Sequence, residues 1–144
     1  MAKMIFVNLP VTDLDRSVAF YEAIGFSKNP QFSNEVAASM VWSDTIYVML
    51  QTHDFWKTFT SKAIPDAHVS AQVALCVTFD SRAEVDAITE TAGKSGGKAD
   101  PNPPQDHGFM YQRSFEDPDG HAWEPVWMDP AVASGEQRPE EVAG

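Results

Sequence analysis

The sequence predicts an α+β fold built from two βαβββ modules, and three observations support this class. The stretch "VTDLDRSVAFYEAIGF" has a counterpart in "VTFDSRAEVDAITETAG", with the same order of strand end, helix cap, helix and glycine. Short apolar runs rich in β-forming residues surround each helix. A length of 144 residues with 43 % hydrophobic content suits a single core. We therefore expect one domain over 1–130, with module one at 1–52, a connector at 53–70 and module two at 71–128.

Module one begins with an apolar run at 4–9 that predicts a buried strand. Asp13 is expected to cap a helix that ends at Gly25. The remaining apolar runs predict three strands, near 26–32, 36–42 and 45–51, the last two joined by a hairpin turn at 43–44. The connector lacks periodicity apart from a short helical turn that Asp54 is expected to cap.

Module two repeats this order. A strand over 72–79 precedes a helix that Ser81 is expected to cap and that carries an apolar face of Val85, Ile88 and Ala92. The proline-containing stretch 98–105 predicts an edge strand followed by a loop. Two final strands, 109–115 and 121–128, flank the turn "DPDG" at 117–120. From residue 131 to 144 the composition predicts a disordered tail.

Charge and composition exclude several classes of protein. A formal charge of −11 with scattered Lys and Arg argues against binding nucleic acid. There is no apolar run of about 18 residues and no signal-peptide pattern, so we expect a cytoplasmic protein without a membrane partner. Cys76 is the only cysteine, which excludes intramolecular disulfides and thiolate zinc sites. Its apolar neighbours predict a buried, inert thiol.

Two motifs carry a family resemblance: "LPVTDLDRSVAFYEAIGF" at 9–26 and "FMYQRSFEDPDGHAWE" at 109–124. With the duplicated module, they make the chain resemble the vicinal oxygen chelate superfamily, which includes glyoxalases, bleomycin-resistance proteins and extradiol dioxygenases. The opening "MIFVNLPV" and the late "WMDP" are most similar to bacterial proteins labelled as predicted lactoylglutathione lyases. The resemblance implies a mixed β-sheet cupped around a cavity, and a homodimer. In metal-dependent members a divalent ion there stabilises an enediolate or similar oxyanion.

The resemblance also implies four metal-ligand positions, one on the first and one on the last strand of each module. On this chain they fall on Phe6, on one of residues 49–51, on Ala74 and on Glu124. Phenylalanine and alanine cannot ligate a metal, so Glu124 is the only retained ligand type. One carboxylate does not hold a divalent ion against water. We therefore expect no metal cofactor, although a non-standard site stays open as the disfavoured alternative.

A polar replacement for the metal site is a second expectation. Residues two apart on a strand share a face, which places Asn8 beside Phe6 and Gln72 beside Ala74. If Gln51 also points inward, these amides form a ring with Glu124 that can bind a ligand. Asn8 is equally well interpreted as organising the turn before Pro10.

Glu124 itself has two interpretations. In a cavity lined by residues such as Phe6 and Met49, its carboxylate would be desolvated and suited to act as a general base. Alternatively, Arg113 pairs with it and the pair is structural. Tyr111 and Arg113 share a strand face, so they could instead contact an anionic ligand.

The resemblance places His107 near the cavity mouth, where an imidazole can act as acid or base. An exposed loop histidine is the competing interpretation. His121, directly after the turn, is expected to be structural.

Three functions are consistent with these residues. The first is a glyoxalase-like lyase or isomerase with Glu124 as base. The second is a metal-free protein of the bleomycin-resistance type that sequesters a cationic or aromatic compound. The third, a metal-dependent lactoylglutathione lyase or extradiol dioxygenase, is the weakest, because the mapped positions lack the donors it needs. The sequence leaves open whether the protein is an enzyme and which ligand it binds.

Overall fold

The N-terminal part of the chain forms a four-stranded sheet, here called sheet A. The structure is a computed structural model that describes residues 2–136 and 138. Its first strand, β1 (Ile5–Val11), runs parallel to β4 (Ile46–Thr52), and β3 (Ala37–Val41) and β2 (Ser27–Asn29) continue the sheet antiparallel. The strand order is β1-β4-β3-β2, and the helix α1 (Leu14–Ala23) follows β1 in the chain.

The C-terminal part forms sheet B around its last strand, β10 (Ala122–Met128). One edge of β10 pairs parallel with β5 (Ala74–Phe79), and the other pairs antiparallel with two short strands. The remaining elements of this part are α3 (Arg82–Lys94), β6 (Lys98–Ala99), β7 (Gln105–Asp106), β8 (Met110–Gln112) and β9 (Phe115–Glu116). The two parts confirm the predicted α+β class.

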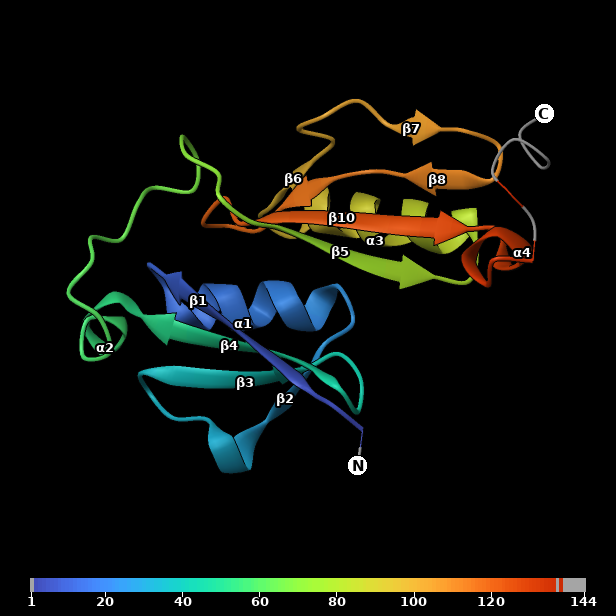
Figure 1. Ribbon diagram of the computed structural model, residues 1–144. Helices are drawn as coiled ribbons and strands as arrows, with labels where there is room; N and C mark the ends of the chain where they lie inside the picture. Colours follow the sequence, from blue (N-terminus) through green and yellow to red (C-terminus); the bar gives the residue numbers. More distant parts are fainter. Residues whose placement is uncertain (1, 137, 139–144) are drawn as a thin grey trace.

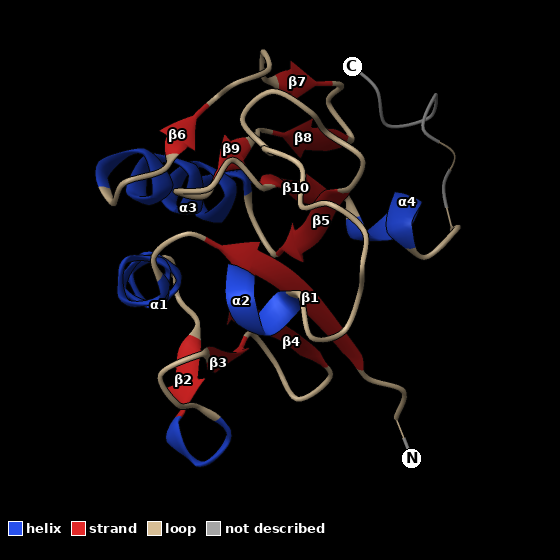
Figure 2. Ribbon diagram, turned by 90° about the vertical axis from the view of Figure 1, so that its left-hand side faces the viewer, coloured by secondary structure: helices blue, strands red, loops and turns tan. Residues whose placement is uncertain are grey.

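Both long helices lie on the same side of the molecule. In Figure 1, β1 crosses in front of α1 and β10 crosses in front of α3. Figure 2, turned by 90°, shows α1 and α3 stacked on one side and the sheets on the other. The connector, with the short helix α2 (His53–Trp56), links the sheets at one end. Each sheet therefore has one face turned away from the helices, here called its open face.

The predicted N-terminal caps of the two long helices are confirmed. Asp13 accepts a hydrogen bond from the Arg16 amide at 3.1 Å, and Ser81 accepts one from the Glu84 amide at 3.2 Å. These side chains satisfy amides that the first helical turn leaves without a partner. Gly25 follows α1 with φ of +117°, a conformation that favours glycine.

Two predicted strands are shorter than expected. The strand over 26–32 stops at Asn29, and Pro30–Phe32 forms a 3-10 turn instead. Pro30 has no amide for the ladder, and the Asn29 side chain caps the turn by accepting from the Gln31 amide. The strand over 109–115 is interrupted between β8 and β9, where Arg113 N donates to Pro125 O across the sheet.

Three further boundaries differ from the prediction. Thr52 rather than Asp54 caps α2, through a hydrogen bond from the Phe55 amide. The stretch 98–105 carries short strands only at its two ends. The tail begins with a helix, α4 (Pro130–Ala133), which Asp129 caps, so its first residues are ordered as a helical turn. The predicted disorder at 137 and 139–144 falls outside the described residues.

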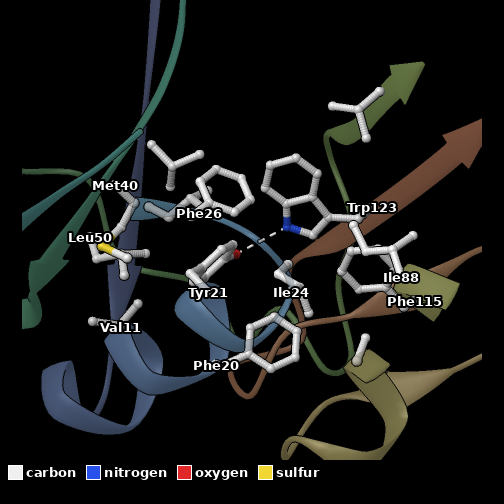
Figure 3. Packing of buried hydrophobic residues seen from close by; sticks show 14 of the residues in the cluster. Val11, Phe20, Tyr21, Ile24, Phe26, Met40, Leu50, Ile88, Phe115 and Trp123 are labelled. Atoms are coloured by element: carbon white, nitrogen blue, oxygen red, sulfur yellow. Dashed lines mark hydrogen bonds between the residues drawn. The ribbon is translucent and has the colours of Figure 1, made fainter. Parts of the chain in front are cut away.

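The core joins the two parts of the chain (Figure 3). α1 contributes Phe20, Tyr21 and Ile24, which point between the sheets. Their neighbours come from both sheets and from α3: Val11, Met40, Leu50, Ile88, Phe115 and Trp123. Since one continuous apolar cluster serves both modules, neither module has a separate core. Within the described residues, no helix combines the length and apolar character needed to cross a bilayer.

The "DPDG" turn between β9 and β10 docks on module one through two buried carboxylates. Asp119 accepts from the Thr12 amide at 3.0 Å, from the Thr12 hydroxyl at 2.7 Å and from the Ser17 hydroxyl at 3.4 Å. Asp117 accepts from the Tyr21 hydroxyl at 2.7 Å. On its other oxygen, Asp117 accepts the amides of residues 119 and 121. The turn is therefore an inter-module clamp as well as a chain reversal.

Tyr21 completes this clamp at the centre of the core. Its hydroxyl also accepts a hydrogen bond of 3.0 Å from the Trp123 indole nitrogen (Figure 3). Burial, and then the charge of Asp117, raise the pKa of Tyr21 well above its ordinary value. The phenol is thus a protonated donor wherever the protein is folded at neutral pH. Burial also raises the pKa of Asp117, because removal from water disfavours the charged carboxylate.

Tyr21→Phe should destabilise the protein by about 2 to 4 kcal/mol, because it leaves a buried carboxylate oxygen and a buried indole N–H without a partner. Urea unfolding followed by fluorescence measures the loss. The matched control is Tyr47→Phe, whose hydroxyl donates to the Asp44 carbonyl on an exposed turn. That variant should change stability by less than about 1 kcal/mol. Equal losses for the two variants would contradict the role assigned to the clamp.

Candidate functional site

Strand alternation decides which side chains reach the open face of sheet B. On β5, Leu75 and Val77 point to the core, whereas Ala74 and Cys76 point to the open face. On β10, Trp123 is in the core, so Glu124 lies on the open face, next to Cys76 in the strand register. On β5 and β10 the open face therefore carries one thiol and one carboxylate, on adjacent strands.

A hollow of about 490 Å³, here called the sheet B hollow, lies at the end of this face nearest the clamp. Two predicted site residues, Gln72 and Glu124, border it together with Ala74. Its other walls come from β6, from the loop after it, from β9 and from the start of β10: Ala71, Val73, Lys98, Pro101, Asn102, Ser114, Phe115, Glu116, Ala122 and Trp123. It is large enough for a small organic molecule.

The Glu124 carboxylate is oriented by a neutral amide. Gln112 on β8 donates from Nε2 to Glu124 Oε2 at 2.8 Å. The other oxygen, Oε1, accepts no hydrogen bond from residues 2–136, and no cation in that range forms an ion pair with it. Glu124 is half-buried. It therefore offers a positioned acceptor, or a base, to a molecule in the hollow.

Cys76 corrects one expectation from the sequence. Its apolar neighbours predicted a buried thiol, but the side chain is exposed on the open face. The reason is that Leu75 and Val77 alternate with it and occupy the core side of the strand. Partial burial, and then the charge of Glu124, raise the pKa of this thiol. The thiol is accessible but is less ionised than a free cysteine at the same pH.

The other two members of the predicted polar ring lie on sheet A. Gln51 Nε2 donates to Asn8 Oδ1 at 2.9 Å, and both side chains share the open face with Phe6 and Met49. Of residues 49–51, Met49 and Gln51 therefore face outward, because Leu50 between them points into the core. The ring residues thus fall into two pairs on different sheets, Asn8 with Gln51 and Gln72 with Glu124.

Phe6, at the first implied ligand position, stacks on a neighbouring ring. Its centroid lies 4.6 Å from that of Tyr47, with the ring planes 10° apart. The Phe6 side chain is nevertheless 49 % exposed. It forms part of an apolar surface on the open face of sheet A.

Tyr111 and Arg113 share one strand face, as expected, but that face is turned toward α3. The Tyr111 hydroxyl donates to Asp86 at 2.6 Å. Arg113 is 10 % exposed and pairs with Asp86, Glu90 and Asp100. The hydrogen bonds to Asp100 are the main cause that raises the pKa of Arg113 above its ordinary value. Both residues are therefore on the opposite side of sheet B from Glu124, and Arg113 is not its partner.

His107 lies in the turn between β7 and β8. Its imidazole is exposed, stacks on Phe109 with 6.0 Å between centroids, and has Gln105 Oε1 at 3.5 Å. β8 pairs with the C-terminal end of β10, where Met110 faces Met128. Four residues of strand, about 13 Å, separate that level from Glu124. The structure does not bring His107 and Glu124 together.

His121, expected to be structural, has Nε2 2.8 Å from the Pro10 carbonyl oxygen. This contact adds to the clamp between the two modules. It commits one ring nitrogen of His121 to the backbone of β1.

The residues at the implied ligand positions do not fit a divalent metal. Phe6 and Ala74 carry no donor atoms, and the open face of β4 offers only the thioether of Met49 and the neutral amide of Gln51, which is hydrogen-bonded to Asn8. Within the described residues, no three His, Cys, Asp or Glu side chains are grouped to hold an ion. Glu124, with its amide partner, is the single carboxylate that the four positions provide.

Several polar residues of this site were not singled out by the sequence pattern. Gln112 orients Glu124, and Lys98 and Asn102 border the hollow. Gln112 could have been found, because it alternates with Tyr111 and Arg113 and must face the other way. Lys98 and Asn102 reach the hollow through the pairing of β6 with β9, which no local pattern reveals.

Comparisons with known proteins agree on the fold. A hypothetical protein from S. aureus matches with a TM-score of 0.73 and 23% identity, over 88% of this chain and 95% of that one. A glyoxalase/bleomycin resistance protein/dioxygenase family enzyme from Burkholderia phytofirmans PsJN matches with a TM-score of 0.71 and 16% identity, over 88% and 99%. The fosfomycin resistance protein FosX from Listeria monocytogenes gives 0.62 and 19%, over 88% and 91%.

These identities are too low to transfer an activity, and no protein of curated function matches the sequence. The sequence profile of one superfamily, however, matches residues 3–124, which span both sheets and end at Glu124. The chain therefore belongs to the Glyoxalase/Bleomycin resistance protein/Dioxygenase superfamily.

Proposed function

We propose that this protein binds a small organic molecule in the sheet B hollow, with Glu124 as its main polar contact and without a divalent metal. The observation that carries the proposal is the environment of the Glu124 carboxylate. Its carboxylate borders the hollow, is held by Gln112 and has no cationic partner within residues 2–136. A ligand that donates a hydrogen bond or carries positive charge would satisfy the free oxygen.

The residues around Glu124 support recognition of an organic group rather than an ion. A divalent cation needs several converging anionic or imidazole donors. Here the implied ligand position that borders the hollow together with Glu124 is Ala74, which offers only a methyl group. Gln72 and Asn102 add neutral amides at the border of the hollow. Such groups orient a polar organic molecule through hydrogen bonds.

Catalysis by Glu124 is a second candidate, favoured by its unoccupied oxygen. As a base, Glu124 would take a proton from a bound carbonyl compound, as in a lyase or isomerase. Turnover of a methylglyoxal and glutathione mixture that survives chelators and is lost in Glu124→Gln would support this activity. Binding of a simple organic cation such as n-butylammonium, without any turnover of the methylglyoxal and glutathione mixture, would favour sequestration instead.

Glu124→Gln should weaken binding of n-butylammonium, a simple cationic probe, at least about tenfold, because it removes a charge-assisted hydrogen bond. Titrations followed by amide NMR shifts measure the affinity. Glu22→Gln makes the same charge change on an exposed position of α1 and should leave the affinity within about twofold. Stoichiometric binding of Zn²⁺, Mn²⁺ or Ni²⁺ that depends on Glu124 would contradict the metal-free site.

The thiol of Cys76 reports on Glu124 directly. Burial and the charge of Glu124 raise the pKa of Cys76, so less thiolate is present at pH 8 than for an ordinary cysteine. The rate at which a disulfide reagent labels Cys76 should therefore rise as the pH is raised. Glu124→Gln removes one of the two causes and should speed labelling at pH 8 by about two- to fivefold. Glu116→Gln, in the same hollow, is the control and should not change the rate. An unchanged rate in both variants would refute the contact.

We also propose that two copies pair through the open face of sheet A. This face carries no charged side chain on β1, β3 or β4, although the chain as a whole has a charge of −11. On this face the Phe6 side chain is 49 % exposed. An uncharged surface with exposed large apolar residues is typical of an interface.

Light scattering coupled to size exclusion should give twice the mass of one chain. Phe6→Glu places a charge in the proposed interface and should convert the protein to a monomer. Phe32→Glu, on the exposed 3-10 turn, is the control and should remain dimeric. A wild-type monomer at all concentrations would exclude the proposed pairing.

A further inference from the structure

A second hollow adjoins the sheet B hollow and has a different chemical character. This junction hollow, of about 270 Å³, lies where the connector crosses the end of β1 and the start of β5. Figure 2 shows α2 in front of β1 at this end of the molecule. Leu9, Trp56, Pro65 and Leu75 form its apolar walls.

No Asp, Glu, Lys or Arg among the described residues borders the junction hollow. His121 borders it, but one of its ring nitrogens is committed to the Pro10 carbonyl oxygen. Gly120 has φ of +91°, and a methyl group there would approach the backbone of Ala67 and His68 to 2.7 Å. The connector therefore packs tightly on the clamp and closes this side of the hollow. A cavity of about 150 Å³ with apolar walls is large enough for benzene, so an aromatic ring fits here.

The two hollows share a border. Residues 71–73 and Ala122 line both of them. Ala122 and Glu124 are two residues apart on β10, which corresponds to about 7 Å. The border that the two hollows share therefore begins about 7 Å along β10 from Glu124, a span that a short alkyl chain can bridge.

We propose that the ligand is an elongated organic cation, with an ammonium or amidinium group at Glu124 and an aromatic or branched alkyl group in the junction hollow beside Trp56. This inference rests on the proposed function, since it requires Glu124 to be the polar contact. The carboxylate selects the charge, and the uncharged hollow adds affinity by burying apolar surface. A linker of at least about four atoms is needed to pass from Glu124 across the border that the two hollows share.

The test compares two probes, n-butylammonium and 4-phenylbutylammonium, by NMR titration of the full-length protein. The phenyl compound should bind at least about tenfold tighter, because only it reaches the junction hollow. It alone should shift the indole resonance of Trp56. Trp56→Ala should reduce the ratio of the two affinities to about threefold or less. Phe59→Ala, an exposed position just beyond α2 and outside the hollow walls, is the matched control and should keep the full ratio.

The outcomes separate the two proposals. Binding of both probes that depends on Glu124, with equal affinities and no shift of the Trp56 indole, would overturn the elongated ligand and leave the proposed function in place. Binding of neither probe, or binding that is unchanged in Glu124→Gln, would overturn both. The indole shift is measured in the wild-type protein, so the test does not depend on the folding of Trp56→Ala.

Discussion

The structure depends on two buried carboxylates that hold the modules together. Asp117 is 2 % exposed and Asp119 is 8 % exposed, in a chain that already carries a charge of −11. Burying such groups is costly unless donors surround them. Three hydrogen bonds to each, from backbone amides and from hydroxyls of module one, provide that compensation. Because β10 begins directly after this turn, the clamp also fixes where Glu124 stands relative to β1.

Because both long helices pack on one side of the molecule, the open faces of the two sheets carry the side chains that the core does not use. The core takes one set of alternating positions from each sheet, and the open faces receive the rest. On sheet A these are uncharged, and Gln51 donates a hydrogen bond to Asn8. On sheet B they include Glu124, Cys76 and the border of a hollow. One fold thus presents an uncharged surface on sheet A and a hollow bordered by a carboxylate on sheet B, although the sequence repeat would suggest two equivalent halves.

Features set by local chemistry were predictable from the sequence, and those set by distant contacts were not. Asp13 and Ser81 cap their helices because a cap needs only an amide a few residues away. Alternation placed Tyr111 and Arg113 on a common face, but only the carboxylates of α3 show which face it is. The prediction that the Cys76 thiol is buried was wrong, because its apolar neighbours in the sequence point to the other face of the strand and do not cover it. The pairing of Gln72 with Glu124 at one hollow required the register of β5 with β10.

The residues that remove metal donors also shape the site that remains. Ala74 has no donor atoms, and its small side chain leaves space in the hollow directly opposite Ala122 in the strand register. Phe6 packs its ring against Tyr47 on the neighbouring strand of sheet A. Gln112 orients Glu124 by a neutral hydrogen bond, which leaves the negative charge unneutralised. A carboxylate in this state is better matched to a donor carried by an organic ligand than to an ion that would need partners the surrounding strands do not provide.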